Sequence, residues 1–268
     1  MSKHNIYHVK SYIEVGEAMD FLFVGIIGLV IGSFLNVCIY RIPREESISY
    51  PPSHCGSCNH GLGVLDLVPL LSYICLRGRC RYCGDKISLR YPIIESLNCI
   101  LYLLVYAKYG LTIYTIKFCI LTSLLIVIGM IDFKTQDVYT STTLFGLIVG
   151  VIFIGIQYFI YKEGIAHLFI GGLAGALLIG IIVYLTRGMG EGDIEIAGIC
   201  GVFLGLKGIL LALFLAIISG GIVGVFILAL KLKKAKDKIA FGPFIAIGSI
   251  IAMLYGNYVI SWYFKLLV

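Results

Sequence analysis

The chain has 268 residues, of which 59% are hydrophobic and 13% charged, with a formal net charge of +6 and a mean hydropathy of +0.98. Soluble domains carry about 25% charged residues, so this composition excludes a soluble globular protein and indicates a polytopic membrane protein. The basic residues form no module with interleaved aromatic residues, which favours contact with anionic membrane lipid and argues against nucleic acid binding.

After a polar N-terminal segment, residues 1–20, the chain contains a series of apolar runs. A helix needs about 17 to 25 apolar residues to cross a bilayer. We therefore predict an all-α fold with about eight transmembrane helices, two of them short. The first run lacks a basic flank and a small-residue cleavage pattern, so we expect an uncleaved helix. The runs are 21–40, 92–107, 113–131, 141–161, 168–186, 194–206, 208–230 and 243–264.

The lysines and arginines predict the orientation, because cytoplasmic loops accumulate them. The loop 41–91 holds seven, and the segment "KLKKAKDK", 231–238, holds five. With Lys134 and Arg187, fourteen of the twenty-one lie on one side of an eight-span arrangement. We expect that side to face the cytoplasm. The short run 194–206 must cross for this to hold, since otherwise 231–238 would lie outside.

Two CxxC pairs lie in the polar loop 41–91 and are separated by 21 residues. This pattern is typical of a zinc ribbon, and a cytoplasmic location favours a metal over disulfides. Four thiolates leave no open coordination position, so we expect structural zinc. A redox dithiol is the alternative, although its usual βαβ context is missing. The predicted ligands are Cys55, Cys58, Cys80 and Cys83.

Glycines and histidines lie in or beside the two CxxC pairs. Gly56 and Gly84 lie where each pair requires a tight bend, which glycine permits. His54 and His60 flank the first pair and could replace a cysteine as ligand, although exposed loop histidines are common.

Two aspartates are predicted at helix ends on the same membrane face. Asp132 directly follows the third run and Asp193 directly precedes the sixth, and the chain crosses twice between them. Ionised carboxylates beside apolar sequence are costly and usually functional. Two neighbouring carboxylates do not both ionise easily, so one can activate water while the protonated one polarises a carbonyl. Helix capping, or a position in head-group water, is the simpler interpretation of each aspartate.

The stretch "GMGEGD", 188–193, favours the catalytic interpretation. Its alternating glycines permit close approach by an extended peptide, so Gly190 and Gly192 are predicted to bind substrate. An ion- or proton-coupled transporter would use carboxylates at glycine-broken helices too, but it predicts acids near mid-membrane and internal repeats. A zinc-dependent scaffold without chemistry is a third class, and it would survive mutation of both aspartates.

An ordered set of motifs covering most of the chain resembles the type IV prepilin peptidases, a family of GxGD aspartyl proteases. The motifs are "GSFLNVCIYRIP" (32–43), the two CxxC pairs, "DLVPLLSYICLRGRCRYCGDKISLRYPIIE" (66–95), "IDFKTQDVY" (131–139), "GMGEGD" (188–193) and "FGPF" (241–244).

The resemblance implies catalysis by Asp132 and Asp193, with Asp137 not carried over. It implies removal of the basic leader of prepilins or pseudopilins after a glycine, with N-methylation of the new terminus by S-adenosylmethionine. It also implies a bacterial inner membrane enzyme whose active site faces the cytoplasm. Within it we expect a first transmembrane helix at 21–40, a cytoplasmic zinc-binding loop at 41–91 and a protease core at 92–268.

Three positions depart from the family pattern. Glu195 stands where the family commonly has Lys, and Tyr139 and Ala240 replace prolines. The Glu195 change removes any role that the lysine has in the family. As a hypothesis, Glu191 and Glu195 attract the basic leader through their negative potential; the simpler interpretation is that both are solvated at the membrane surface.

Overall fold

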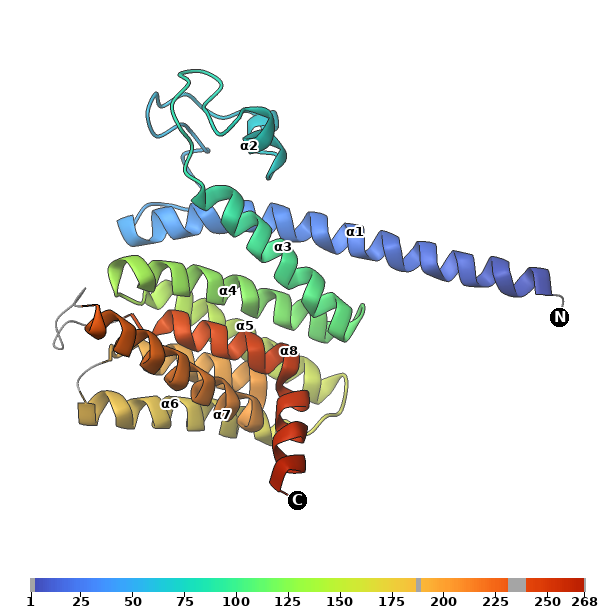
Figure 1. Ribbon diagram of the computed structural model, residues 1–268, viewed down its shortest axis with the longest axis vertical. Coiled ribbons are helices and arrows are strands. Elements are labelled where there is room, and N and C mark those ends of the chain that lie inside the picture. The colour runs from blue at the N-terminus through green and yellow to red at the C-terminus, as the bar shows by residue number, and fades with distance from the viewer. Residues whose placement is uncertain (1–2, 187–188, 231–239, 268) are drawn as a thin grey trace. The chain divides into compact units, whose positions relative to one another are not determined.

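The structure is a computed structural model that describes residues 3–186, 189–230 and 240–267, and over these ranges it is all-α, as predicted (Figure 1). The predicted basic segment 231–238 lies outside the described residues. Short 3-10 turns, η1 and η2, occupy Ile42–Arg44 and Val64–Asp66. The α-helices are α1 (Lys3–Arg41), α2 (Leu71–Cys75), α3 (Arg90–Tyr109), α4 (Ile113–Thr135), α5 (Thr140–Phe159), α6 (Ala166–Thr186), α7 (Gly192–Ala229) and α8 (Gly242–Leu267).

The chain divides into two compact units. The first comprises Met1–Arg41 and Ser47–Thr115, and the second comprises Ile42–Glu46 and Ile116–Val268. The division places α3 with α1, whereas the sequence suggested a core that begins at residue 92. The boundary at residue 92 between the loop and the protease core stays a prediction.

Within the described residues, six helices are long and apolar enough to cross a membrane. They confirm a polytopic membrane protein, but they do not confirm the count of eight. The predicted run 92–107 forms α3, which is not among the six, and the runs 194–206 and 208–230 form the single element α7. The six are 18–44, 113–135, 140–159, 166–186, 192–229 and 242–263.

The α7 element is interrupted at Gly205, whose φ of 72° and ψ of 176° are not helical. A Cβ on Gly175 of α6 would lie 2.5 Å from Ala197 O and 3.0 Å from Ile209 Cγ1. A straight helix would separate two residues twelve positions apart by about 18 Å. The chain therefore reverses at Gly205, where the predicted runs meet, and both ends of α7 lie on the same side in Figure 1.

In the first unit, glycines let α1 approach α3 closely. A Cβ on Gly28 or Gly32 would lie 2.8 Å from the Cα of Cys99 or Glu95. The Asn98 side-chain amide donates to Gly28 O across the same contact, at 2.7 Å. Small residues and interhelical hydrogen bonds commonly hold helices together in lipid, where no hydrophobic force drives association.

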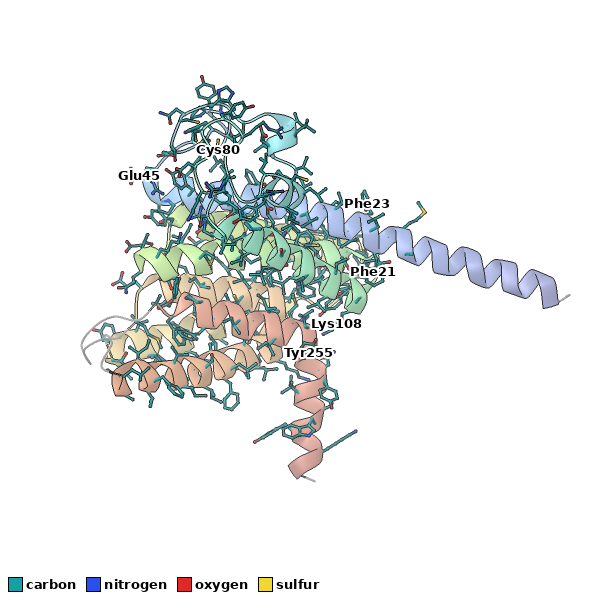
Figure 2. All side chains as sticks on the ribbon, turned by 45° about the horizontal axis from the view of Figure 1, so that its top comes forward. Phe21, Phe23, Glu45, Cys80, Lys108 and Tyr255 are labelled. Carbon is teal, nitrogen blue, oxygen red and sulfur yellow. The ribbon has the colours of Figure 1, made fainter. Side chains whose placement is uncertain are left out.

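Large apolar side chains cover the outward faces of the helices in each unit. Phe23 of α1 is 63% exposed, and Tyr255 of α8 is 53% exposed. Figure 2 shows both projecting from their helices. Such faces would be a liability in water but are expected where a helix contacts lipid.

Candidate functional site

Asp132 lies in the last turn of α4 and is 4% exposed. Its Oδ2 accepts a hydrogen bond of 2.8 Å from the backbone N–H of Gly242, the first residue of α8. The first N–H groups of a helix have no intrahelical partner and carry a partial positive charge. The start of α8 therefore holds the Asp132 carboxylate in a fixed position.

Asp193 lies in the first turn of α7 and is also 4% exposed. Its Oδ2 accepts a hydrogen bond of 3.1 Å from the backbone N–H of Gly190, in the segment that precedes the helix. The side chain thereby closes the turn that leads into α7. Both aspartates are thus buried at helix termini, and each is fixed by one backbone donor.

The two carboxylates line one cavity of about 610 Å³ and interact electrostatically with each other. This volume lies within the usual range for ligand pockets, about 300–1,000 Å³. The structure therefore brings together the two aspartates selected from the sequence. The cavity is also lined by Gln136, Asp137, Val138, Val183, Tyr184, Met189, Gly190, Glu191, Gly192, Ala240 and Phe241.

The other acids of the region differ from the buried pair. Asp137 and Glu191 line the cavity but are exposed, so water solvates their charges. Glu195 is exposed on α7 and does not line the cavity. Among the acids that the structure describes, only Asp132 and Asp193 combine burial with a shared cavity. This arrangement lets two carboxyl groups divide acid and base roles.

The glycines beside the aspartates have different surroundings. A Cβ on Gly192 would overlap the side chain of Val138, so this position needs glycine for packing. A Cβ on Gly190 would meet nothing closer than Asp193 Oδ2, at 3.8 Å. A Cβ on Gly242 would lie 2.7 Å from Asp132 Oδ2. Sequence reasoning gave Gly242 no role, although it lies in the motif "FGPF" that pointed to the family.

The four predicted cysteine ligands meet in the first unit, with their sulfurs within 4.8 Å of one another. Cys80 of this group is labelled in Figure 2. The Sγ atoms of Cys55 and Cys83 are 3.9 Å apart. Sulfurs at about 2.3 Å from a tetrahedral zinc lie about 3.8 Å apart, so the donor set fits a closed metal site. Among the described residues no histidine joins the group.

Two backbone turns of the same kind hold the sulfurs. Asn59 N–H donates to Cys55 O at 2.9 Å, and Gly84 N–H donates to Cys80 O at 3.0 Å. Asn59 and Gly84 have positive φ values of 56° and 74°. The tight bend expected at Gly84 is therefore confirmed by its left-handed backbone. In the first turn the residue with left-handed backbone is Asn59, whereas Gly56 has no positive φ. Asparagine tolerates this conformation better than most residues.

The surroundings of the four thiols shift the pKa values of two of them in opposite directions. The backbone N–H groups of Cys58 and Ser57 lower the pKa of Cys55 to about 6. The pKa of Cys83 is about 12: a backbone hydrogen bond at Asp85 lowers it, but desolvation and hydrogen bonds with the other three thiols raise it more. Four thiolates so close repel one another unless a cation lies between them.

Polar contacts brace the loop around the cysteines. Asp66 Oδ1 and Arg81 Nε form an ion pair at 2.6 Å, and hydrogen bonding to Arg81 lowers the pKa of Asp66. Ser57 donates a hydrogen bond to Asp85 and thereby joins the two cysteine turns. The buried Glu95 of α3 accepts a hydrogen bond of 2.8 Å from Leu70 N–H. The loop is thus tied to itself and to α3.

Comparisons with known proteins match both parts of the chain. Residues 26–109 match the family model described as "Bacterial Peptidase A24 N-terminal domain", and residues 119–225 match "Type IV leader peptidase family". The four cysteines lie in the first match, and both aspartates lie in the second.

Curated relatives named "Prepilin leader peptidase/N-methyltransferase" match most of the chain. The protein of Pseudomonas putida is 30% identical, over 87% of this chain and 89% of its own length. The protein of Bacillus subtilis is 31% identical, over 90% and 96%. The protein of Legionella pneumophila is 32% identical, over 91% and 94%. No solved structure matches the chain.

Proposed function

Because the chain belongs to the type IV leader peptidase family, we propose that Asp132 and Asp193 are the catalytic pair with which it removes prepilin leader peptides. Family membership identifies the chain as a membrane protease with N-methyltransferase activity that processes prepilins. One observation supports the residue assignment above all. Two buried carboxyl groups from separate helices line one cavity, and each accepts a backbone hydrogen bond.

In the proposed reaction the ionised aspartate removes a proton from water, whose oxygen then attacks the scissile carbonyl carbon. The protonated aspartate gives its proton to the carbonyl oxygen, and a tetrahedral intermediate forms. The C–N bond then breaks as the leaving nitrogen takes the proton that the first aspartate removed from water. A hydroxyl of the intermediate returns its proton to the second aspartate as the C=O bond of the new carboxyl group forms. The Gly190 and Gly242 N–H groups hold the carboxylates in the positions that this exchange requires.

Replacement of single carboxyl groups tests the pair. Asp132→Asn and Asp193→Asn preserve size but cannot exchange the proton, so each should abolish cleavage of a prepilin by purified protein. Asp137→Asn is the matched control, because this exposed aspartate lines the same cavity. Mass spectrometry of the prepilin reports leader loss. Cleavage at the wild-type rate by either of the first two variants would contradict the assignment.

The metal proposed for the four cysteines is zinc in a structural role. All four donors are sulfurs, and no coordination position is left for water or substrate. Zinc would therefore order the loop and take no part in peptide hydrolysis. S-adenosylmethionine is the proposed methyl donor for the N-methyltransferase activity, and we assign no residues to it.

The proposed location is the bacterial inner membrane, with the aspartates at the cytoplasmic face and prepilins or pseudopilins as partners. The exposed Glu191 at the cavity supports attraction of a basic leader. Glu195 lies outside the cavity lining, so its contribution should be smaller. Replacing Glu191 and Glu195 with Gln should raise the KM for prepilin at low salt, and an unchanged KM would remove this idea.

The transporter alternative has no support. Both aspartates lie in terminal turns of their helices, whereas a coupled transporter binds its ions near mid-membrane. The family models and curated relatives describe peptidases over both parts of the chain.

A further inference from the structure

Lys117 is a buried cation in the second turn of α4, and it is 3% exposed. Among the described residues of the second unit, Lys117, Asp132 and Asp193 are the only charged residues that are buried. An ionised side chain within a membrane-spanning helix is costly and usually has a function. The fifteen residues from Lys117 to Asp132 correspond to about 22 Å of helix. Lys117 therefore lies at the other end of α4 and does not line the aspartate cavity.

The ammonium group of Lys117 is joined to a carboxylate through one side-chain amide. Its Nζ donates a hydrogen bond of 3.1 Å to Gln157 Oε1, near the end of α5. Gln157 Nε2 donates one of 3.0 Å to Glu163 Oε2, in the connection between α5 and α6. The carboxylate of Glu163 also interacts electrostatically with Lys117. Lys117, Gln157 and Glu163, the Lys117 relay, thus tie α4 to the end of α5.

The same ammonium group lies over an aromatic ring of α7. Its Nζ is 5.9 Å from the centre of the Phe203 ring, and Phe203 is 1% exposed. A cation within about 6 Å of a ring centre is attracted to the ring face, and more strongly where water is excluded. Phe203 belongs to the first half of α7, residues 192–204, which begins with Asp193 and precedes the reversal at Gly205. Lys117 therefore joins the helix of Asp132 to the half-helix of Asp193.

The same three helices meet again between Lys117 and the aspartates. A Cβ on Gly146 of α5 would lie 2.5 Å from Leu124 Cδ2 of α4 and 3.1 Å from Ile199 Cγ2 of α7. Gly146 therefore lets both neighbours pack directly on the backbone of α5. The ends of α4 and α7 that carry the aspartates are thus connected to the Lys117 end by continuous packing.

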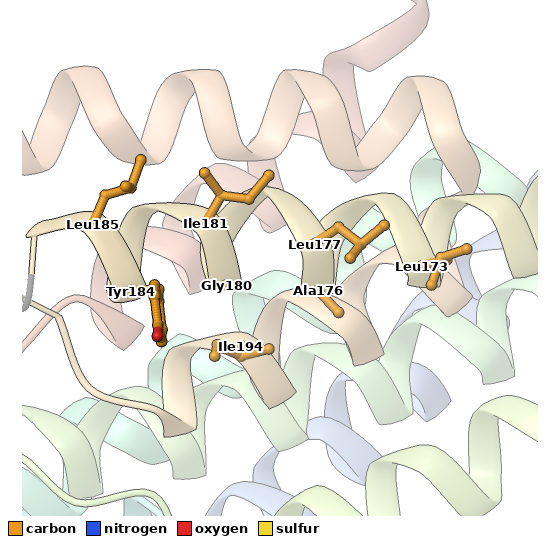
Figure 3. A pocket seen from close by; sticks show the side chains of 8 residues that line it. All are labelled: Leu173, Ala176, Leu177, Gly180, Ile181, Tyr184, Leu185 and Ile194. Carbon is orange, nitrogen blue, oxygen red and sulfur yellow. The ribbon is translucent and has the colours of Figure 1, made fainter.

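The first half of α7 is also packed along α6 (Figure 3). Near its start, a Cβ on Gly180 of α6 would lie 3.8 Å from Ile194 Cδ1; near its end, a Cβ on Gly172 would lie 2.7 Å from Val202 Cγ2. Close-packed interiors transmit strain instead of absorbing it. A shift of this half-helix at Phe203 should therefore reach Asp193.

We propose that Lys117 is a positioning residue for the aspartate pair. By holding the first half of α7 against α4 at the end far from the cavity, it fixes the position of Asp193 relative to Asp132. The inference rests on the proposed function, because it assumes that these two carboxyl groups cleave the peptide. Lys117 touches neither the substrate nor the reacting atoms, and it acts through the two helices that it joins.

Replacement of the buried cation tests the proposal. Lys117→Met keeps an unbranched side chain without the charge, and Lys117→Arg keeps a cation. Lys207→Met is the matched control, because Lys207 is an exposed lysine of α7. Gln157→Leu breaks the relay with Lys117 in place and serves if Lys117→Met does not fold. Purified full-length variants are assayed on a prepilin for kcat and KM separately, at a temperature where thermal unfolding curves show them fully folded.

Lys117→Met should lower kcat by about 10- to 100-fold, as expected when reacting groups are misplaced by up to about 1 Å, and leave KM unchanged. Gln157→Leu should lower kcat in the same direction, Lys117→Arg should retain most of it, and Lys207→Met all of it. An unchanged kcat in fully folded Lys117→Met would overturn the proposal, because Lys117 would then only stabilise the fold. Equal losses in Lys117→Met and Lys117→Arg would overturn it as well, since the charge would not matter.

Hydrogen exchange tests the positioning without turnover. Residues 196–200 of α7 should exchange faster in Lys117→Met than in the wild type and in Lys207→Met. Faster exchange confined to the end of α5 and the connection that follows it would overturn the proposal, because the relay would then brace only its own surroundings. Failure of the wild type to cleave prepilin would remove the proposed function, whereas the exchange result would still decide whether Lys117 holds α7.

Discussion

The cysteine loop and the aspartate cavity are built over different sequence distances. Each cysteine turn closes through hydrogen bonds between residues four or five positions apart, such as Asn59 to Cys55 and Cys55 to His60. The aspartate cavity depends on contacts such as that of Gly242 with Asp132, 110 residues away. The loop is therefore specified by short motifs and by the metal proposed for it, whereas the cavity exists only when several helix ends are packed together.

The largest effect is expected from removal of a cysteine ligand. Structural zinc contributes about 10–16 kcal/mol to small zinc domains, so Cys80→Ser should lose the bound metal and the order of the loop. Elemental analysis measures the zinc, and hydrogen exchange measures the order. Cys75→Ser is the control, since Cys75 lies in α2 outside the sulfur cluster.

The same experiment examines the contrast between the two regions. In Cys80→Ser, faster exchange should be confined to the loop and spare the ends of α4 and α8. Exchange that spreads to those helix ends would show that the aspartate cavity depends on the metal. Retention of zinc by Cys80→Ser would contradict the ligand assignment.

A smaller effect is expected from one added methyl group at the aspartate cavity. Gly192→Ala forces Val138 and the start of α7 apart and displaces Asp193, and a displacement of about 1 Å can cost about 100-fold in rate. Gly221→Ala adds the same group on α7 away from the cavity, where a Cβ meets nothing within 4 Å, so its rate should stay near that of the wild type. The measurement is kcat/KM for prepilin cleavage. Equal rates for the two variants would mean that close packing does not position Asp193.

The smallest effect is expected at the ion pair of the loop. Asp66→Asn removes the charge that pairs with Arg81, so loop protection in hydrogen exchange should fall slightly at neutral pH. The pKa of Asp66 is lowered in the folded loop, so its contribution is present above the pKa of the unfolded chain and is lost as the pH falls through the lowered value. The difference from wild type should vanish over that interval.

A double-variant comparison checks that the effect belongs to the pair. Arg81→Gln should reproduce the loss caused by Asp66→Asn, and the double variant should lose little more, because residues that interact directly are not additive. Additive losses would show that Asp66 acts through Tyr82 Oη or Gly63 N–H, its other hydrogen-bond donors.

The sequence predicted the all-α membrane fold because a bilayer requires long apolar helices. It also selected the four cysteines, whose spacing reflects local turn geometry, and the two aspartates that the structure places in one cavity. The predicted number of eight spans is not confirmed, because apolar length alone does not determine whether a helix such as α3 crosses the membrane. The reversal at Gly205 coincides with the predicted boundary between two runs, but its backbone conformation is seen only in the fold.

By itself, then, the sequence determined what depends on composition and short spacing: membrane helices, a four-cysteine turn pair and acids beside apolar runs. Only the tertiary structure decided that Gly242 holds Asp132, that Gly192 packs against Val138, and that Lys117 contacts both α5 and α7. The physical reason is that backbone donors, steric fit and cavities belong to pairs of distant segments. The residue pattern of one segment does not identify the distant segment that it contacts.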